Sequence, residues 1–210
     1  MRKKKLINIF CLSGVISIVF YVLHDIIGAM NYTGYNWLSQ AVSDLTAKDA
    51  PSFVIAHGLV NIYSIFNCLC CALLCIVIEK NNKQLKLGVY LFSIMNFISA
   101  IGYALFPLSS AGFDGSISSI IHVYIITVVV VLLSIISLVL IAIGSLKENN
   151  KLLGYLAILA LILMFMGTIL SGVVPKAYFG VFERFSTYSA VIFTGILGIY
   201  GFINNEYNIK

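Results

Sequence analysis

Six long apolar stretches dominate the chain and restrict its fold more than any other feature. Each is close to the roughly 20 residues that a helix needs to cross the hydrocarbon core of a bilayer. Because a bilayer core offers no water to backbone polar groups, continuous apolar stretches of this length must be helical. We therefore predict an all-α fold, a polytopic membrane protein with one membrane domain over residues 1–210 and a bundle of six transmembrane helices. The predicted spans are about 6–30, 52–78, 87–107, 118–146, 152–173 and 185–204.

The composition excludes several other classes of protein. Hydrophobic residues make up 60% of the chain and charged residues 10%, against roughly 25% charged residues in an average soluble domain. Such a chain is neither a soluble globular protein nor a disordered one. The net charge is +5, but the basic residues form short clusters between apolar stretches. Because no basic stripe alternates with exposed aromatic residues, we expect no nucleic-acid partner.

The basic residues predict the direction in which the chain crosses the membrane. Three of the 13 Lys and Arg residues, Lys48, Lys176 and Arg184, lie in the connections near 31–51, 108–117 and 174–184. The other ten lie on the side that carries both ends of the chain. The positive-inside rule therefore predicts a multi-pass protein of the cell membrane with both termini in the cytoplasm. These ten residues are Arg2, Lys3, Lys4, Lys5, Lys80, Lys83, Lys86, Lys147, Lys151 and Lys210.

All three histidines fall at the outer ends of predicted helices. They are His24 near the end of the first helix, His57 near the start of the second and His122 near the start of the fourth. Asp25 follows His24, and five apolar or small residues after it place the pair below the membrane surface. An ionisable side chain costs roughly 2.5–3.5 kcal/mol near the centre of a span, and such groups normally face the bundle and find partners. We therefore expect an outward-facing polar pocket between these helices. The alternative is that each histidine lies separately at the membrane interface.

The first outer connection is long, and its apolar residues recur at near-helical spacing. This pattern predicts a short amphipathic helix at the outer surface, anchored by the only tryptophan. The alternative is a surface loop without chemistry. The apolar positions are Trp37, Leu38, Val42 and Leu45. The polar positions, expected to line the other face and cover the pocket, are Ser39, Gln40, Ser43 and Asp44.

The same connection resembles a known signature. Residues 35–51 contain Leu38-Ser39-Gln40, Ser43-Asp44-Leu45 and Ala50-Pro51. This order is similar to the Ser-Gln, Ser-Glu-Leu and Gly-Ala-Pro elements of the bacterial and archaeal six-helix membrane proteins grouped as domain of unknown function 998. Two later elements also resemble that family: Phe106-Pro107 followed by His122, and Phe182-Glu183-Arg184.

The resemblance implies the six-helix fold, but it implies no activity. It also has two departures. Asp44 stands where glutamate is usual, and Ser109 stands near the place where an acidic residue often follows the proline, with Asp114 close by.

The polar residues give three sets of candidate site residues. Acid–base groups for catalysis are His57, His122, Asp44 and Glu183. Residues expected to bind a ligand are Arg184, Ser39, Gln40 and Trp37, because a guanidinium binds phosphate or carboxylate bidentately. Residues of the types that ligate zinc are His24, Asp25, His57 and His122. Their spacing matches no metal-binding motif, so a divalent metal such as zinc is not the favoured cofactor.

Three functions remain open at this stage. The first is binding or modification of a lipid or lipid-linked substrate, with an anionic lipid as a partner besides the bilayer itself. The second is a structural or sensory membrane protein without turnover. The third is a small-molecule transporter, which the absence of charged residues from the middle of the third, fourth and fifth predicted helices disfavours.

Overall fold

The structure, a computed structural model, describes residues 2–78 and 81–203, with side chains from residue 6 onward. Several basic residues assigned above to the cytoplasmic side therefore lie outside the described side chains. They are Arg2, Lys3, Lys4, Lys5, Lys80 and Lys210.

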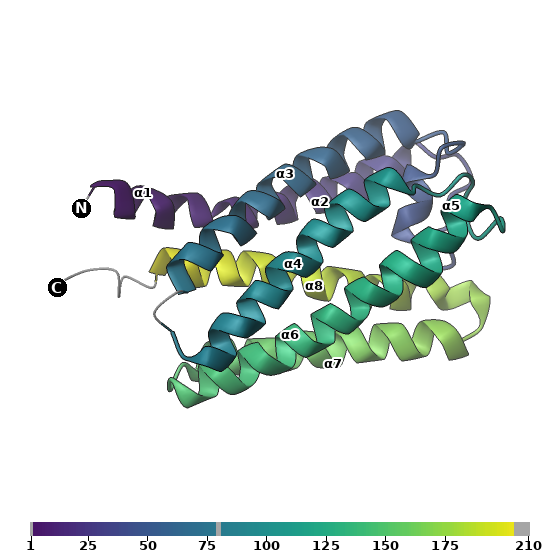
Figure 1. Ribbon diagram of the computed structural model, residues 1–210. Helices are drawn as coiled ribbons and strands as arrows, with labels where there is room; N and C mark the ends of the chain where they lie inside the picture. Colours follow the sequence, from purple (N-terminus) through teal and green to yellow (C-terminus); the bar gives the residue numbers. More distant parts are fainter. Residues whose placement is uncertain (1, 79–80, 204–210) are drawn as a thin grey trace.

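Six helices of the described residues are long and apolar enough to cross a membrane, which confirms the predicted all-α, multi-pass architecture (Figure 1). The first span, Leu6–Met30, joins α1 (Arg2–Cys11) to α2 (Ser13–Met30). The second and third spans are α3 (Phe53–Val77) and α4 (Lys83–Leu105). The fourth, Ile117–Lys147, consists of α5 (Ile117–Ile120), a π-helical turn η3 (Ile121–Ile126) and α6 (Thr127–Lys147). The fifth is α7 (Lys151–Val173), and the sixth, Lys176–Ile203, contains η4 (Lys176–Tyr178) and α8 (Phe179–Ile203).

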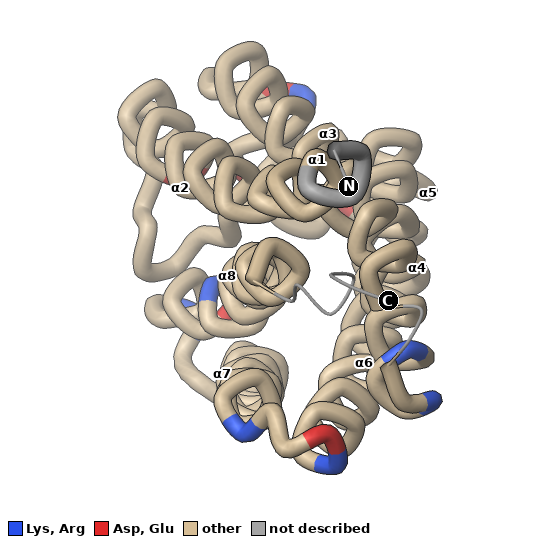
Figure 2. Tube along the Cα trace, turned by 90° about the vertical axis from the view of Figure 1, so that its left-hand side faces the viewer, with Lys and Arg blue, Asp and Glu red and all other residues tan. Residues whose placement is uncertain are grey.

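The two ends of the bundle differ. One end, which we call the loop end, carries the connections 31–52, 106–116 and 174–178, and the other, the termini end, carries both ends of the chain (Figure 1). Figure 2 views the termini end and shows basic segments where α4 and α7 begin and where α6 ends. There the Glu148 carboxylate accepts hydrogen bonds from the side chain of Asn81 and the backbone N–H of Asn82, both at 2.6 Å. These bonds tie the two short connections of that end together.

Two predicted elements differ from the structure. The last helix begins at Phe179 instead of near residue 185, so Glu183 and Arg184 belong to its first turns and not to a connection. The predicted amphipathic helix is reduced to a 3-10 turn, η1 (Val42–Thr46). The physical reason is that the carbonyl groups of residues 37, 38 and 40 accept hydrogen bonds from α8 and are not available to a local helix.

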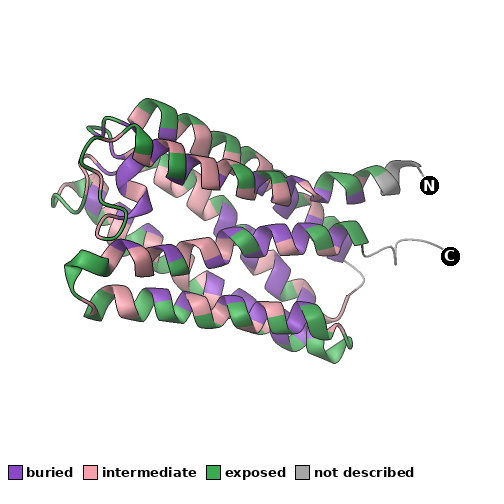
Figure 3. Cartoon of the chain, turned by 180° about the vertical axis from the view of Figure 1, so that it is seen from behind, coloured by how far each residue is buried: buried purple, intermediate pink, exposed green. Residues whose placement is uncertain are grey.

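The apolar core lies mainly toward the termini end. Its centre includes the edge-to-face pair Phe92 and Phe193, whose ring centroids are 5.5 Å apart, with Leu85, Leu138 and Leu197 fully buried. Figure 3 shows buried residues running along α8, while exposed and partly exposed residues predominate along α7. In the most apolar 18-residue stretch of the sixth span, 44% of the residues are buried. In the corresponding stretch of the fifth span, 22% are buried. The sixth span is therefore central, and α7 is peripheral.

Small residues allow the helices to approach closely, as expected for membrane bundles. A Cβ atom at Gly144 would overlap the backbone of Leu85, which explains the tight contact of α6 with α4. A Cβ atom at Gly167 would likewise overlap the backbone N of Ser186, so α7 and α8 meet at this point. The close packing leaves α8 fixed between α2 and α7.

Candidate functional site

The connection 31–52 folds over the first turns of α8. The backbone N–H of Val181 donates to the carbonyl of Leu38 at 3.3 Å. The carbonyls of Trp37 and Gln40 lie so close to Gly180 that a Cβ atom there would overlap them. Glycine at position 180 is therefore what lets the loop rest directly on the helix.

Arg184 fastens this loop to the bundle. Its Nη1 group donates to the carbonyls of Trp37 at 3.1 Å, Gln40 at 3.0 Å and Gly180 at 3.0 Å. Its Nη2 group donates to the Tyr35 hydroxyl at 2.7 Å. Because α8 begins at Phe179, Arg184 is one turn and a half into the helix and directly below these carbonyls.

Arg184 also forms a buried ion pair with Asp25 of α2. Nε donates to Asp25 Oδ2 at 2.9 Å and Nη2 to Oδ1 at 2.7 Å, and each side chain is 4% exposed. This bidentate geometry is the strongest form of a charge-assisted hydrogen bond. All guanidinium N–H groups thus meet acceptors of this chain, and a ligand of Arg184 would have to displace one of them.

Aromatic side chains complete the surroundings of the ion pair. The Arg184 Cζ atom lies 4.4 Å from the centre of the Trp37 ring, a cation–π distance. The Trp37 indole N–H donates to Asp25 Oδ2 at 3.3 Å, and the Tyr188 hydroxyl donates to the same oxygen at 3.0 Å. Trp37 is therefore not only an anchor at the membrane surface, because it bonds to an intramembrane charge.

Two more carboxylates hold the start of η1. Asp44 is buried, and it accepts from the backbone N–H of Ala41 at 3.1 Å and of Gly112 at 2.8 Å. Glu183 Oε2 accepts from the N–H of Val42 at 3.2 Å, while its Oε1 accepts from the Thr187 hydroxyl at 3.1 Å. Burial is the largest influence on the pKa of Asp44 and raises it, and the two backbone N–H groups oppose that shift.

A pocket of about 410 Å³ opens beside this turn at the loop end. That volume falls within the roughly 300–1,000 Å³ of typical small-molecule sites. Its polar lining includes Ser39, Gln40, Ser43 and Asp44, which are the four residues that the sequence predicts on the polar face of this connection. Phe113 contributes an apolar wall from the second connection, and Phe179 contributes one from the start of α8.

The three histidines have separate surroundings. His24 is buried, and neither ring nitrogen has a hydrogen-bond partner among the described residues. Among the described residues, the hydrogen-bond and ring partners of His57 belong to its own helix: Nδ1 lies 3.2 Å from the Asn61 amide, and the ring stacks on Phe53.

His122 lies on η3, a single π-helical turn of the kind that is frequent at functional sites. Its Nδ1 is 2.8 Å from the carbonyl of Phe106, and its ring packs on Tyr103 at 4.5 Å. A carbonyl oxygen only accepts, so Nδ1 carries the proton and Nε2 keeps a lone pair.

The structure thus brings together only some of the predicted site residues. Trp37, Gln40, Asp25 and Arg184 share one cluster, while Ser39, Ser43 and Asp44 line the adjoining pocket. His57 forms no hydrogen bond, ion pair or ring contact with any of them in the described part of the chain. Within residues 2–78 and 81–203, no group of three or more His, Cys, Asp or Glu side chains is placed to hold a metal ion.

Sequence reasoning missed three residues of the cluster: Tyr35, Gly180 and Tyr188. The tyrosines have no sequence signal, because tyrosine is common at membrane interfaces. The pairing of Asp25 with Arg184 had an indirect signal, since charged residues of opposite sign within spans are expected to find one another.

Comparison with known proteins adds one finding. A family model described as "Protein of unknown function (DUF998)" matches residues 15–200, which is most of the chain. No curated protein and no solved structure gives a significant match.

Proposed function

This chain belongs to the DUF998 family. From the geometry of the site, we propose that it binds the polar head group of a lipid or lipid-linked molecule at the outer surface of the cell membrane. The observation that carries the proposal is the pocket of about 410 Å³ at the loop end. Its mixed lining, with a buried carboxylate beside two hydroxyl groups and an amide, suits a head group that offers several hydrogen bonds.

The charge distribution supports an external position for this pocket. Lys83, Lys86, Lys147 and Lys151 all belong to the termini end, and the positive-inside rule places that end in the cytoplasm. The loop end then faces the outside, and a ligand reaches the pocket from the outer leaflet.

The interior of the bundle favours one-sided binding over transport. Polar side chains such as Tyr63, Tyr103 and Glu183 lie toward the loop end, where the spans α3, α4 and α8 meet the connections. Toward the termini end the buried side chains of the described residues carry no charge: they form the apolar cluster around Phe92 and Phe193, with neutral polar residues such as the hydrogen-bonded pair Asn67 and Asn96. A transporter would usually have charged or broken helices at this depth.

Chemical modification of the bound head group is a second candidate function, and His122 favours it. The hydrogen bond of Nδ1 to Phe106 fixes the tautomer that leaves Nε2 free to accept a proton, as a general base requires. Val123, the next residue, lines the pocket, so His122 belongs to the same helical turn as a pocket residue. Asp44 and Glu183, which both hold the start of η1, are the candidate acidic partners.

The binding proposal is tested on the full chain in mild detergent, supplied with an equimolar mixture of phosphatidylglycerol, phosphatidylethanolamine and phosphatidylcholine. Native mass spectrometry then measures which head group is retained. We expect one head group to be preferred, and Ser43→Phe, which fills the pocket, to abolish the preference. Thr33→Phe is the matched control, because Thr33 is an exposed hydroxyl residue of the same connection outside the pocket. Equal retention of all three lipids by the unaltered chain, or the same preference in Ser43→Phe, would contradict the proposal.

A further inference from the structure

A second cavity, of about 390 Å³, runs along the lipid-facing side of α7 and α8. Its wall on α7 is formed by Leu156, Leu159 and Leu163, and its wall on α8 includes Ile192 and Ile196. We call this cavity the α7–α8 groove. It is distinct from the pocket beside η1, with which it shares no lining residue.

The polar groups of the α7–α8 groove lie toward one end. Trp37, Arg184 and Tyr188 belong to the cluster at the loop end, and the walls toward the termini end are aliphatic. Along α8 the lining extends from Val181 to Ile196, which corresponds to about 22 Å at 1.5 Å per residue. One leaflet of a bilayer contributes about half of the roughly 30 Å hydrocarbon core. The groove is therefore long enough to enclose the part of an acyl chain that one leaflet holds.

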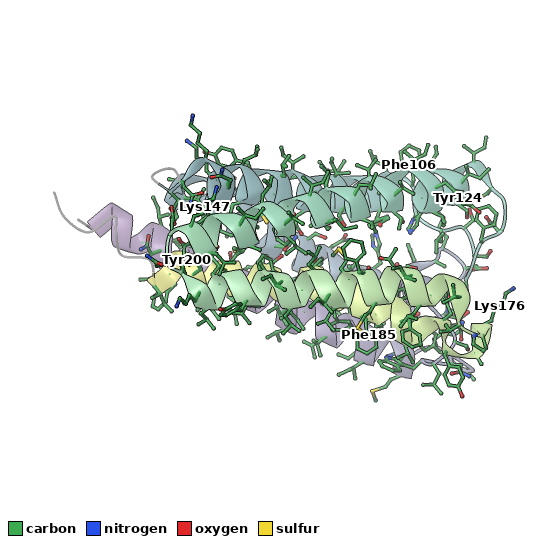
Figure 4. All side chains as sticks on the ribbon, turned by 90° about the horizontal axis from the view of Figure 1, so that it is seen from below. Phe106, Tyr124, Lys147, Lys176, Phe185 and Tyr200 are labelled. Atoms are coloured by element: carbon green, nitrogen blue, oxygen red, sulfur yellow. The ribbon has the colours of Figure 1, made fainter. Side chains whose placement is uncertain are left out.

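Figure 4 locates one lining residue of the groove along the bundle. Lys176 marks the loop end of the last span and Tyr200 its other end, with Phe185, a lining residue, nearer the loop end. The groove follows the long axis of the helices, as acyl chains do in a bilayer.

The contacts of Arg184 restrict what the groove recognises. Every N–H group of its guanidinium is already bonded within the chain, and the side chain is 4% exposed. The groove therefore offers shape and apolar surface instead of a free positive charge. Trp37 is 45% exposed, so its ring forms an accessible edge where the groove begins.

We infer that the α7–α8 groove seats one acyl chain of an outer-leaflet lipid. This inference rests on the proposed function for the side of the membrane, and it deepens that function by naming an amphiphile with a long acyl chain as the ligand class. The loop segment Trp37–Gln40 lies between the groove and the pocket, since Trp37 lines the first and Gln40 the second. A lipid whose acyl chain occupies the groove thus presents its head group to that segment.

The only tryptophan of the chain is a direct reporter of this site. The full chain is reconstituted in phosphatidylcholine vesicles that contain increasing fractions of phosphatidylcholine brominated in the upper part of one acyl chain, and Trp37 fluorescence is recorded. A seated acyl chain gives a saturable component of quenching in addition to the gradual effect of the surrounding bilayer.

Two pairs of variants test whether the groove is responsible. Leu159→Phe and Ile192→Phe fill the groove from α7 and α8, respectively. Their controls, Ile162→Phe and Ile199→Phe, alter residues of the same helices with nearly the same exposure, 50% against 51% and 44% against 45%. Neither control residue lines the groove.

We expect both groove variants to lose the saturable component and both controls to keep it. If all five proteins show the same quenching, the acyl-chain site is overturned, whatever head group the pocket prefers. If the groove variants alone lose the component while the head-group assay finds no preference, the groove stands and the head-group proposal fails. The two results are thus distinguishable.

Discussion

Loss of the Arg184 guanidinium should destabilise the bundle far more than loss of an ordinary charge on the same span. In Arg184→Met, Asp25 keeps its charge in a site where it is 3% exposed, and it retains only the neutral donors Trp37 and Tyr188. Removing one partner of a buried ion pair typically costs about 3–5 kcal/mol. The carbonyls of residues 37, 40 and 180 also lose their shared donor. We therefore expect a loss of at least about 3 kcal/mol in the free energy of unfolding.

A double-mutant cycle separates the ion pair from the loop contacts. Asp25→Asn alone leaves the buried guanidinium without a charged partner, whereas the combined Asp25→Asn and Arg184→Met variant leaves neither charge unpaired. The combined variant should therefore lose less than the sum of the two single changes, with a coupling of about 1–3 kcal/mol. Lys176→Met, in the connection before α8, should stay within about 0.5 kcal/mol of the unaltered chain.

The assay is reversible unfolding in mixed micelles of mild detergent and dodecyl sulfate, followed by circular dichroism of the helices. Additive effects of the two single changes would show that the charges do not stabilise one another. An Arg184→Met loss no larger than that of Lys176→Met would refute the conclusion that Arg184 fastens the loop to the bundle, and the loop would then be held by its other contacts.

Three further results are expected. A topology reporter fused at Lys83 should read cytoplasmic and one at Lys48 external, and the opposite result at Lys48 would invert the orientation. Gly180→Ala should loosen the first connection and raise its rate of proteolysis, because the added Cβ overlaps backbone carbonyls, whereas Gly172→Ala, with open space around it, should not. Hydrogen bonds from a following serine hydroxyl and backbone N–H lower the pKa of Asp114 from 3.8 to about 2. The charged Asp114 carboxylate is favoured in the folded loop. Its contribution to the stability of the loop is therefore complete above pH 3.8 and is lost as the pH falls toward 2. The exchange rate of the loop amides should rise over this pH range. The same rise in Asp114→Asn would assign the effect to another group.

The sequence predicts the spans well because a bilayer imposes a length and an apolar character on each of them. The predicted range 118–146 differs from the span Ile117–Lys147 by one residue at each end. The last span is the exception, since Glu183 and Arg184 look like connection residues until their partners are known. Charges that are paired within the bundle do not interrupt a helix, but their pairing cannot be read from hydropathy.

The site is harder to predict because the rotation of each helix about its axis leaves little trace in the sequence. Lipid and core are both apolar, so an inward face and an outward face carry similar residues. The prediction that His57 shares a pocket with the other histidines depended on that rotation, and in the structure the contacts of His57 are with Phe53 and Asn61 of its own helix. The proximity of Ser39, Gln40, Ser43 and Asp44 does not depend on that rotation, because they belong to one short segment.

The ion pair also imposes an order on biogenesis. Asp25 enters the membrane with the first span, but Arg184 is made 159 residues later. At a synthesis rate of about 5–20 residues per second, Arg184 is made roughly 8–30 s after Asp25. During that interval Asp25 must be protonated, hydrated or shielded by an insertion factor, and a chain cut short before the sixth span keeps it unmatched. Insertion of α8 is therefore the step that seats the first connection and closes the bundle, and unfinished chains carry an intramembrane acid without its basic partner.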